Sequence, residues 1–465
     1  MKIRFLEKIK SQIQLVKHGP YDLSTPEGRD KERTRRIALT ALTALVARII
    51  AVITPLITVR ITLGYLGTEI YGLWLAVSSF FHMVTYADLG LGSGLQTELS
   101  RASALEDRRI CKQLVSTTFF ILVGVALALL IVFASIYNFV DWFMLVNATS
   151  EEAKSLAGGV VAAILIPRIV HIPLAIIQRT QNAMQESYKT NLWQIIGNIL
   201  SLLFVFVISW LGAGKLLMIF ASSSISVIVA AINMLYYFGK ERPELRPSIS
   251  LYDKHISKRL LNTGIAFFVL SIFTTLSLNI DSWIVAKISS LEEVTPFSIM
   301  LKITSLINVV SAMLSTPLWA ANGEALERGE VEWVKHKTNQ IAKLSLYLSS
   351  GMSVILLLLA KPALFILSDG VVPPNYNYLV GMCILNIITA TTNPYFMILN
   401  GGRVIVFQII NYFIYSIISL PAKFCLGSIW GVGCIPWIGS IMYAILLTIP
   451  TYIRAQKVIA SHKTL

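Results

Sequence analysis

Long apolar segments recur along the whole of this 465-residue sequence. A helix needs about 20 consecutive, mostly apolar residues to cross the hydrocarbon core of a membrane. Strands are not expected, because no segment alternates apolar and polar residues along its length. The sequence predicts an all-α integral membrane protein with about twelve transmembrane helices, at residues 37–63, 69–94, 113–136, 156–178, 189–211, 214–238, 261–288, 293–320, 341–367, 376–400, 403–426 and 428–453.

The composition excludes a soluble protein. Charged residues make up 14% of the chain and hydrophobic residues 55%. In an ordinary soluble domain, roughly a quarter of the residues are charged. The net charge of +14 would suggest nucleic-acid binding in a soluble protein. In a membrane protein, Lys and Arg instead accumulate in the cytoplasmic segments.

The Lys and Arg residues are divided unequally between the two sides of the predicted helices. Thirty of the 39 lie in or beside the segments on the side of the termini, and three (Lys154, Lys215 and Lys287) lie on the other side. The positive-inside rule therefore predicts that both termini are cytoplasmic. Because topology accounts for these cations, no nucleic-acid partner is expected.

A basic connector after the sixth predicted helix divides the chain into two sets of six. Its two prolines, Pro243 and Pro247, are typical of an extended linker between lobes. The basic start of the chain is either an amphipathic helix bound to anionic membrane lipids or a solvated tail. The expected organisation is a cytoplasmic N-terminal segment (1–36), an N-lobe (37–238), a cytoplasmic linker (239–260), a C-lobe (261–453) and a cytoplasmic tail (454–465).

Six cations that topology does not explain fall inside the predicted helices, together with two acids. A charge in the middle of a membrane costs about 2.5–3.5 kcal/mol on insertion scales, so each needs a partner, water or a route to the interface. Three of the cations lie near the predicted outer ends of their helices, where long side chains reach the interface. These three are Arg60, Lys361 and Lys423.

The other three cations, Arg48, Arg168 and Lys302, lie nearer the middle of their helices. Arg48 and Arg168 have no acid at a matching depth. Guanidinium groups bind phosphate in a bidentate manner, so these cations predict a water-filled cavity that receives an anion. Lys302 either joins this cavity or forms an ion pair with Asp281, which lies at comparable depth on the preceding helix.

Three intramembrane groups are candidates for ion coupling. His82 and His171 can titrate near neutral pH, and Asp281 can carry a proton or a cation. The alternative for each histidine is a structural hydrogen bond within the bundle. The alternative for Asp281 is the ion pair with Lys302.

A glycine-rich run follows Asp88 near the inner end of the second predicted helix: Gly90, Gly92 and Gly94. Glycine tolerates unusual backbone angles, and an aspartate can cap a helix. These residues predict an inner gate or hinge. The four cysteines are scattered, and no metal-ligand cluster, carboxylate pair or nucleophile–base arrangement is recognisable. No metal site, cofactor or enzyme activity is therefore expected.

Two neighbouring motifs carry a family resemblance. The segment 60–74 (RITLGYLGTEIYGLW) and the segment 87–95 (ADLGLGSGL) resemble the Wzx-type polysaccharide flippases. These flippases belong to the multidrug/oligosaccharidyl-lipid/polysaccharide (MOP) exporter superfamily, which also holds the MATE antiporters and the lipid II flippases. The twelve-helix layout and the chain length extend the similarity over nearly the whole sequence.

The resemblance implies a fold and a function. Two six-helix lobes would enclose a central cavity lined by helices one, two, seven and eight, which carry Arg48, His82, Asp281 and Lys302. Arg168, on helix four, lies outside that set. Alternating access, coupled to H+ or Na+, would move an undecaprenyl-diphosphate-linked oligosaccharide across the bacterial inner membrane for O-antigen or other surface polysaccharide biosynthesis. A polysaccharide polymerase and a chain-length regulator are the implied partners.

The competing hypothesis is a MATE-like multidrug exporter coupled to a cation gradient. A cavity for small organic cations should be acidic and aromatic. The predicted intramembrane cations outnumber the acids, which favours the flippase.

Overall fold

The computed structural model describes residue 21 and residues 25–104, 107–316, 318–327, 329–402 and 404–462. Every regular element in these residues is a helix, which confirms the predicted all-α class. Most of the expected N-terminal segment, residues 1–20 and 22–24, lies outside the described part. The amphipathic helix proposed for it is therefore not placed.

Ten helices of the described chain are long and apolar enough to cross a membrane. A pair bent by 46° around Ile280 raises the number to eleven. The protein is thus a multi-pass membrane protein. The predicted span at 69–94 does not meet the criterion, because its helix ends at Phe80 and a 3-10 turn follows. Leu89 and Gly90 then adopt positive φ angles of 53° and 71°, which interrupts the helix.

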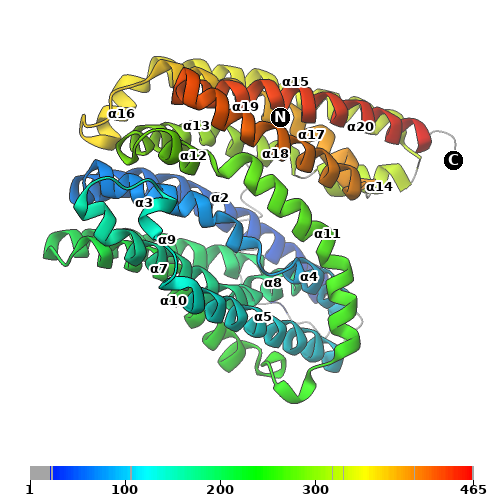
Figure 1. Ribbon diagram of the computed structural model, residues 1–465. Coiled ribbons are helices and arrows are strands. Elements are labelled where there is room, and N and C mark those ends of the chain that lie inside the picture. Colours follow the sequence, from blue (N-terminus) through cyan, green and yellow to red (C-terminus); the bar gives the residue numbers. More distant parts are fainter. Residues whose placement is uncertain are drawn as a thin grey trace, which may run out of the picture.

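The helices form two lobes joined by one long helix (Figure 1). In Figure 1 the N-lobe lies below and the C-lobe above. The N-lobe contains α2 (Pro26–Leu66), α3 (Thr68–Phe80), η1 (Phe81–Tyr86), α4 (Leu91–Ala104), α5 (Arg108–Tyr137), α6 (Trp142–Leu145), α7 (Glu151–Leu174), α8 (Ile176–Ala183), α9 (Ser187–Leu211), α10 (Lys215–Tyr236) and η2 (Tyr237–Glu241).

The connector between the lobes is built of short turns and then a helix that crosses from one lobe to the other (Figure 1). Its turns pack on α5, where the Ser248 backbone N–H donates to Ser116 Oγ at 3.0 Å. The long helix contacts α4 in the N-lobe and α18 in the C-lobe. These elements are η3 (Pro243–Leu245), η4 (Ile249–Leu251) and α11 (Lys254–Asn279).

The C-lobe repeats the up-and-down arrangement of long helices. It contains α12 (Asp281–Ile288), α13 (Leu291–Ser315), α14 (Leu318–Glu327), α15 (Val331–Leu358), α16 (Ala360–Ser368), α17 (Tyr376–Gly401), α18 (Ile405–Trp430), η5 (Val432–Cys434), α19 (Ile435–Tyr443), η6 (Ala444–Thr448) and α20 (Ile449–His462). A serine caps the start of one long helix in each lobe: Ser150 Oγ caps α7 and Ser290 Oγ caps α13. Glutamates in the first turn of both helices complement the helix dipole.

The two lobes meet closely at the end of the bundle opposite the start of α2 and the end of α20, which we call the distal end. Thr295 Oγ1 donates to the Thr68 carbonyl at 2.7 Å, and Trp283 Nε1 donates to the Leu145 carbonyl at 2.8 Å. At Gly72 a Cβ would lie 1.8 Å from the Leu291 carbonyl oxygen, so α3 and α13 approach too closely for any other residue. Gly72, a residue of the first motif, thus serves the contact between the lobes.

Candidate functional site

A cavity of about 610 Å³ lies inside the N-lobe and reaches the C-lobe at α13. Its walls come from α3, α5, α7, α8 and α10, and from the segment that leads into α4. The titratable residues that line it are Tyr71, Asp88, Arg168, His171, Arg179 and Lys302. Three cations and one carboxylate therefore surround one polar space between the lobes. We call this the cationic cavity.

Arg168 enters the cavity from α7 and is held by the break in the neighbouring helix. Its Nη1 donates to the Ser78 carbonyl at 3.0 Å. Because α3 ends at Phe80, the carbonyls of its last turn lie at the negative end of the helix dipole. The guanidinium satisfies one of these carbonyls and keeps its other N–H groups available to the cavity.

Lys302 is the contribution of the C-lobe. Its Nζ donates to Tyr71 Oη at 3.0 Å and lies 5.5 Å from the centre of the same ring. Tyr71 and Trp74, both from the first family motif, line the cavity. Their rings pack edge to face with their centres 5.8 Å apart. The motif therefore builds the wall on which the C-lobe cation rests.

Asp88 and Arg179 face each other across Gly92. A Cβ on Gly92 would lie 2.8 Å from Asp88 Oδ2 and 3.0 Å from Arg179 Nε. Asp88 Oδ1 accepts the backbone N–H of Gly90 at 3.0 Å, as a turn cap. Among the described residues, none of Arg168, Arg179 and Lys302 forms an ion pair. The cavity therefore keeps an excess of uncompensated positive charge.

The predicted hinge residues lie at the break between η1 and α4. Gly90 has the positive φ that the prediction required of a glycine. Gly92 and Gly94 instead belong to α4, where their small size admits Asp88 and Arg179 in one case and the Leu260 carbonyl in the other. The unusual backbone angles are thus confined to Leu89 and Gly90 in this segment.

The structure brings together only part of the predicted set. Arg168, His171 and Lys302 line the cationic cavity, whereas Arg48 is an exposed side chain of α2 and is not part of its lining. His82 lies in η1, half-buried and near enough to Arg168 for electrostatic interaction, but it does not line the cavity.

The alternative in which Asp281 pairs with Lys302 is wrong, although Asp281 does form an ion pair. Asp281 accepts a hydrogen bond from Lys423 Nζ at 2.6 Å, and both side chains are buried in the C-lobe. The bend at Ile280 starts a new helix at Asp281, and α12 packs against α18, which carries Lys423. The expectation that Lys423 reaches the interface is also wrong, because its side chain is only 1% exposed.

The pairing of Asp281 with Lys423 and the burial of Lys423 both have a signal in the sequence. Tyr412, Ser416, Ser419 and Lys423 recur at helical spacing and form the buried face of α18. Arg60 remains half-exposed at the distal end, in an ion pair with Asp369 at 2.8 Å, as expected for a residue near a helix end.

The sequence interpretation missed Arg179, which it assigned to a cytoplasmic loop. Arg179 lies on α8, which continues α7 after a short break, and it lines the cavity with Arg168 and His171. A signal was present: the residues at 168, 171, 175 and 179 are spaced by three or four and share one helical face. Three serines of α10 also line this cavity: Ser222, Ser223 and Ser226.

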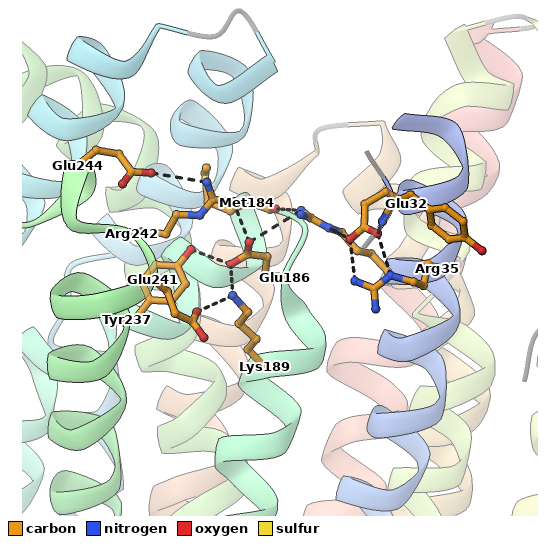
Figure 2. Close-up of polar contacts among 11 residues, drawn as sticks. Glu32, Arg35, Met184, Glu186, Lys189, Tyr237, Glu241, Arg242 and Glu244 are labelled. Carbon is orange, nitrogen blue, oxygen red and sulfur yellow. Dashed lines mark hydrogen bonds and ion pairs between the residues drawn. The ribbon is translucent and has the colours of Figure 1, made fainter. Parts of the chain in front are cut away.

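A second group of charges lies at the end of the N-lobe opposite the distal end. Figure 2 shows Glu186 among Lys189, Tyr237 and Arg242, which come from α9, η2 and the connector. Glu186 is 3% exposed and accepts hydrogen bonds from Tyr237 Oη at 2.9 Å, Arg242 Nη2 at 2.9 Å and Lys189 Nζ at 3.0 Å. Glu241 pairs with Lys189 at 2.5 Å and Glu244 with Arg242 at 3.5 Å. We call this group, together with Glu32 and its two arginines on α2 (Arg35 and Arg36), the Glu186 cluster.

The Glu186 cluster is balanced in charge. Burial alone raises the pKa of Glu186, but the hydrogen bond from Arg242 and the charge of Lys189 outweigh burial and leave the pKa below its ordinary value. Hydrogen bonds from Arg35 and Arg36, acting against burial, lower the pKa of Glu32 to about 2. Arg36 also reaches within 3.9 Å of Glu186, so the cluster ties the start of α2 to the turn before α9.

Comparison with known proteins identifies the family. A family profile described as "Polysaccharide biosynthesis protein" matches residues 34–319, more than half of the chain. A protein of Yersinia pseudotuberculosis described as an O-antigen export protein is 21% identical over 62% of this chain. A protein of Salmonella typhi described as an O-antigen transporter is 22% identical over 65% of it. The matches span 65% and 68% of the length of these two relatives.

Solved structures agree on the fold. A multidrug resistance MATE family transporter of the MOP superfamily, in an inward-facing conformation, superimposes with a TM-score of 0.71 at 13% sequence identity. The superposition covers 88% of this chain and 96% of the transporter. The two-lobed arrangement in Figure 1 is therefore the fold of this transporter. By the match to residues 34–319, the chain belongs to the polysaccharide biosynthesis protein family.

Proposed function

We propose that this protein is a flippase that moves an undecaprenyl-diphosphate-linked oligosaccharide across the bacterial inner membrane by alternating access. The observation that carries the proposal is the cationic cavity, in which Arg168, Arg179 and Lys302 surround a polar space with one carboxylate, Asp88. Unpaired cations inside a membrane protein are costly unless an anion joins them. A diphosphate supplies that charge, and the polyprenyl tail stays in the lipid.

Each group has a role suited to its chemistry. The planar guanidinium groups of Arg168 and Arg179 bind phosphate oxygens in a bidentate manner, and Lys302 adds a compact charge. The hydroxyl groups of Ser222, Ser223 and Ser226 supply neutral donors from α10. Because Lys302 belongs to the C-lobe, the anion would link both lobes, which couples its binding to their relative movement.

Ion coupling has candidates in both lobes. His171 lines the cationic cavity and His82 lies close to Arg168, so protonation of either would change the local charge. Asp281 is held by Lys423 in the C-lobe, where a proton or Na+ would compete with the ammonium group. The break at Asp88 and Gly90 is a candidate hinge, and Gly92 and Gly94 let α4 pack closely beside it.

The remaining assignments follow from the charge distribution and the family. We place the N-lobe at 37–238, the linker at 239–260 and the C-lobe at 261–453, with both termini in the cytoplasm. A polysaccharide polymerase and a chain-length regulator are the proposed protein partners, and membrane lipids surround the helices. The protein acts as a transporter and not as an enzyme, for O-antigen or related polysaccharide biosynthesis.

The competing function is export of small organic cations, which the fold alone would permit because the structural neighbour is a multidrug transporter. The charge of the cavity disfavours this function. Three cations repel a cationic drug, and one carboxylate does not offset them.

The proposal is tested by complementation in the host strain after deletion of the gene. We expect Arg168→Ala and Lys302→Ala to abolish surface polysaccharide and to leave the amount of membrane-inserted protein unchanged. Arg60→Ala is the matched control, because Arg60 lies at the distal end in an exposed ion pair. Normal polysaccharide in both cavity variants would contradict the assignment. Normal polysaccharide in the deletion strain, with altered drug sensitivity, would favour the exporter.

A further inference from the structure

A second cavity, of about 410 Å³, lies wholly within the C-lobe. Its walls come from the end of α11 and from α13, α17, α18 and α19. Its lining contains carboxamide and hydroxyl groups and aromatic rings, and none of the residues that line it is charged. Those polar and aromatic residues are Asn279, Ser305, Asn308, Asn386, Thr389, Asn393, Phe396, Tyr412 and Tyr443. We call it the amide cavity.

One side of the amide cavity is held rigidly by its own hydrogen bonds. Asn308 Nδ2 donates to Asn386 Oδ1, and Thr389 Oγ1 donates to Asn308 Oδ1 at 2.9 Å. Asn386 Nδ2 in turn donates to the Met382 carbonyl at 2.8 Å. This network joins α13 to α17 and fixes the shape of the wall, as interhelical amides do in membrane proteins.

The other side offers free polar groups. Among the described residues, the side-chain amides of Asn279 and Asn393 form no hydrogen bond. Asn279 is exposed and Asn393 is half-buried, and both line the cavity, so their amides are open to water or to a ligand. Each carboxamide carries both donors and acceptors, as a sugar hydroxyl does. The stacked rings of Phe396 and Tyr412, 5.7 Å apart, add an apolar face.

The amide cavity lies next to the cationic cavity. Lys302 lines the cationic cavity and Ser305 lines the amide cavity, one helical turn further along α13, and Ser305 Oγ donates to the Lys302 carbonyl at 2.7 Å. A second link joins Ser79, beside the cationic cavity, to the Asn279 carbonyl. The two cavities therefore border the same turn of α13, and one turn of helix rises about 5.4 Å.

We infer that the amide cavity binds uncharged sugar residues of the same ligand whose diphosphate occupies the cationic cavity. This inference rests on the proposed function. A charged group would find no counter-charge in the amide cavity, and a purely apolar one would leave its amides unsatisfied. A neutral, polyhydroxylated group satisfies the amides, and its C–H faces pack on the rings. The volume lies within the range of about 300–1,000 Å³ that is usual for small-ligand pockets.

The inference is tested by binding to the full-length protein in lipid nanodiscs. Two lipids are compared: undecaprenyl diphosphate, and the lipid-linked oligosaccharide extracted from the host strain after deletion of the gene. We expect the wild-type protein to bind the sugar-bearing lipid about tenfold more tightly, the effect of one or two net hydrogen bonds. In the double variant Asn279→Ala/Asn393→Ala, both lipids should bind with the affinity of the bare diphosphate.

Control variants separate binding from folding. Asn411 is a buried asparagine of α18 that does not line the cavity, and its Nδ2 also lacks a partner, so Asn411→Ala should keep the tenfold preference. The single variants Asn279→Ala and Asn393→Ala should each lose part of it, which keeps the test informative if the double variant does not fold.

Three outcomes would overturn the inference. If the wild-type protein binds both lipids equally, or if the asparagine variants keep the preference, the amide cavity does not bind sugar, while the proposed function stands. If the variants weaken bare undecaprenyl diphosphate as much as the sugar-bearing lipid, the asparagines are structural. If the wild-type protein binds neither lipid, the proposed function fails, and the inference fails with it.

Discussion

Charged side chains gather in two places, one within the N-lobe and one where the N-lobe meets Lys302 of the C-lobe, and they are partnered in opposite ways. In the Glu186 cluster, each carboxylate is surrounded by cations, and Glu186 accepts three hydrogen bonds (Figure 2). In the cationic cavity, Arg168 donates to a carbonyl and Lys302 to a hydroxyl group, which are both neutral acceptors. The first group is electrostatically complete, and the second is not.

The difference teaches how to separate structural from functional charges in a membrane protein. A buried ion pair holds helices in place, but it has no capacity left for a ligand. Cations that contact only neutral acceptors are positioned without being neutralised, so an incoming anion gains most of the interaction. The partner of a buried charge, more than its burial, therefore indicates its role.

The largest effect should come from breaking the Glu186 cluster. Glu186→Gln removes the buried carboxylate that Lys189 and Arg242 share and leaves them only the more exposed Glu241 and Glu244. Removal of one member of a buried pair costs about 3 kcal/mol. We expect a marked drop in the unfolding temperature of the detergent-solubilised protein. Glu152→Gln is the control, because Glu152 pairs with Lys215 at an exposed site, where about 1 kcal/mol or less is at stake. Equal losses in the two variants would contradict the structural role of Glu186.

The cationic cavity should respond in the opposite manner. Arg179→Gln should leave the unfolding temperature nearly unchanged but weaken binding of undecaprenyl diphosphate about tenfold or more, because a charge-assisted hydrogen bond contributes about 1.5–3 kcal/mol. Lys361→Gln is the control, because it also removes one positive charge. Lys361 is an exposed residue of α16 and lies outside the cavity. If Arg179→Gln lowers the unfolding temperature and binding stays normal, Arg179 has a structural role and does not bind the ligand.

The smallest effect is a pH dependence of stability. The pKa of Glu32 is lowered from 4.5 to about 2, and that of Glu186 is also below its ordinary value. A carboxyl whose folded-state pKa is depressed stabilises the fold fully above its unfolded pKa and loses this contribution as pH falls toward the folded value. We expect the unfolding temperature to fall between about pH 4.5 and pH 2.

Glu186→Gln provides the comparison for this pH dependence. The variant lacks one of the two depressed carboxyl groups, so its decline in acid should be shallower than that of the wild-type protein. Parallel curves for the two proteins would show that the Glu186 cluster does not control acid stability.

Most of the fold was accessible from local sequence. Length and apolarity predicted the helical class and eleven of the twelve segments, because the cost of burying a polar residue in lipid is visible residue by residue. The exception, 69–94, has the apolar content of a span, but its α-helix ends at Phe80 and the backbone turns again at Leu89 and Gly90. The deep positions of Arg168 and Lys302 were visible in the same way.

Which charges face one another was not accessible in that way. We expected Arg48 to line the cavity and Arg179 to lie outside it, and the structure shows the reverse. Asp281 pairs with Lys423, 142 residues away, rather than with Lys302. Hydropathy fixes the depth of a side chain along the membrane normal, but not the direction in which it points. That direction depends on the rotation of each helix about its axis and on bends such as the one at Ile280, which packing between distant segments sets. The depth of a side chain follows from the local sequence, whereas the direction in which it points follows from the packing of the whole bundle.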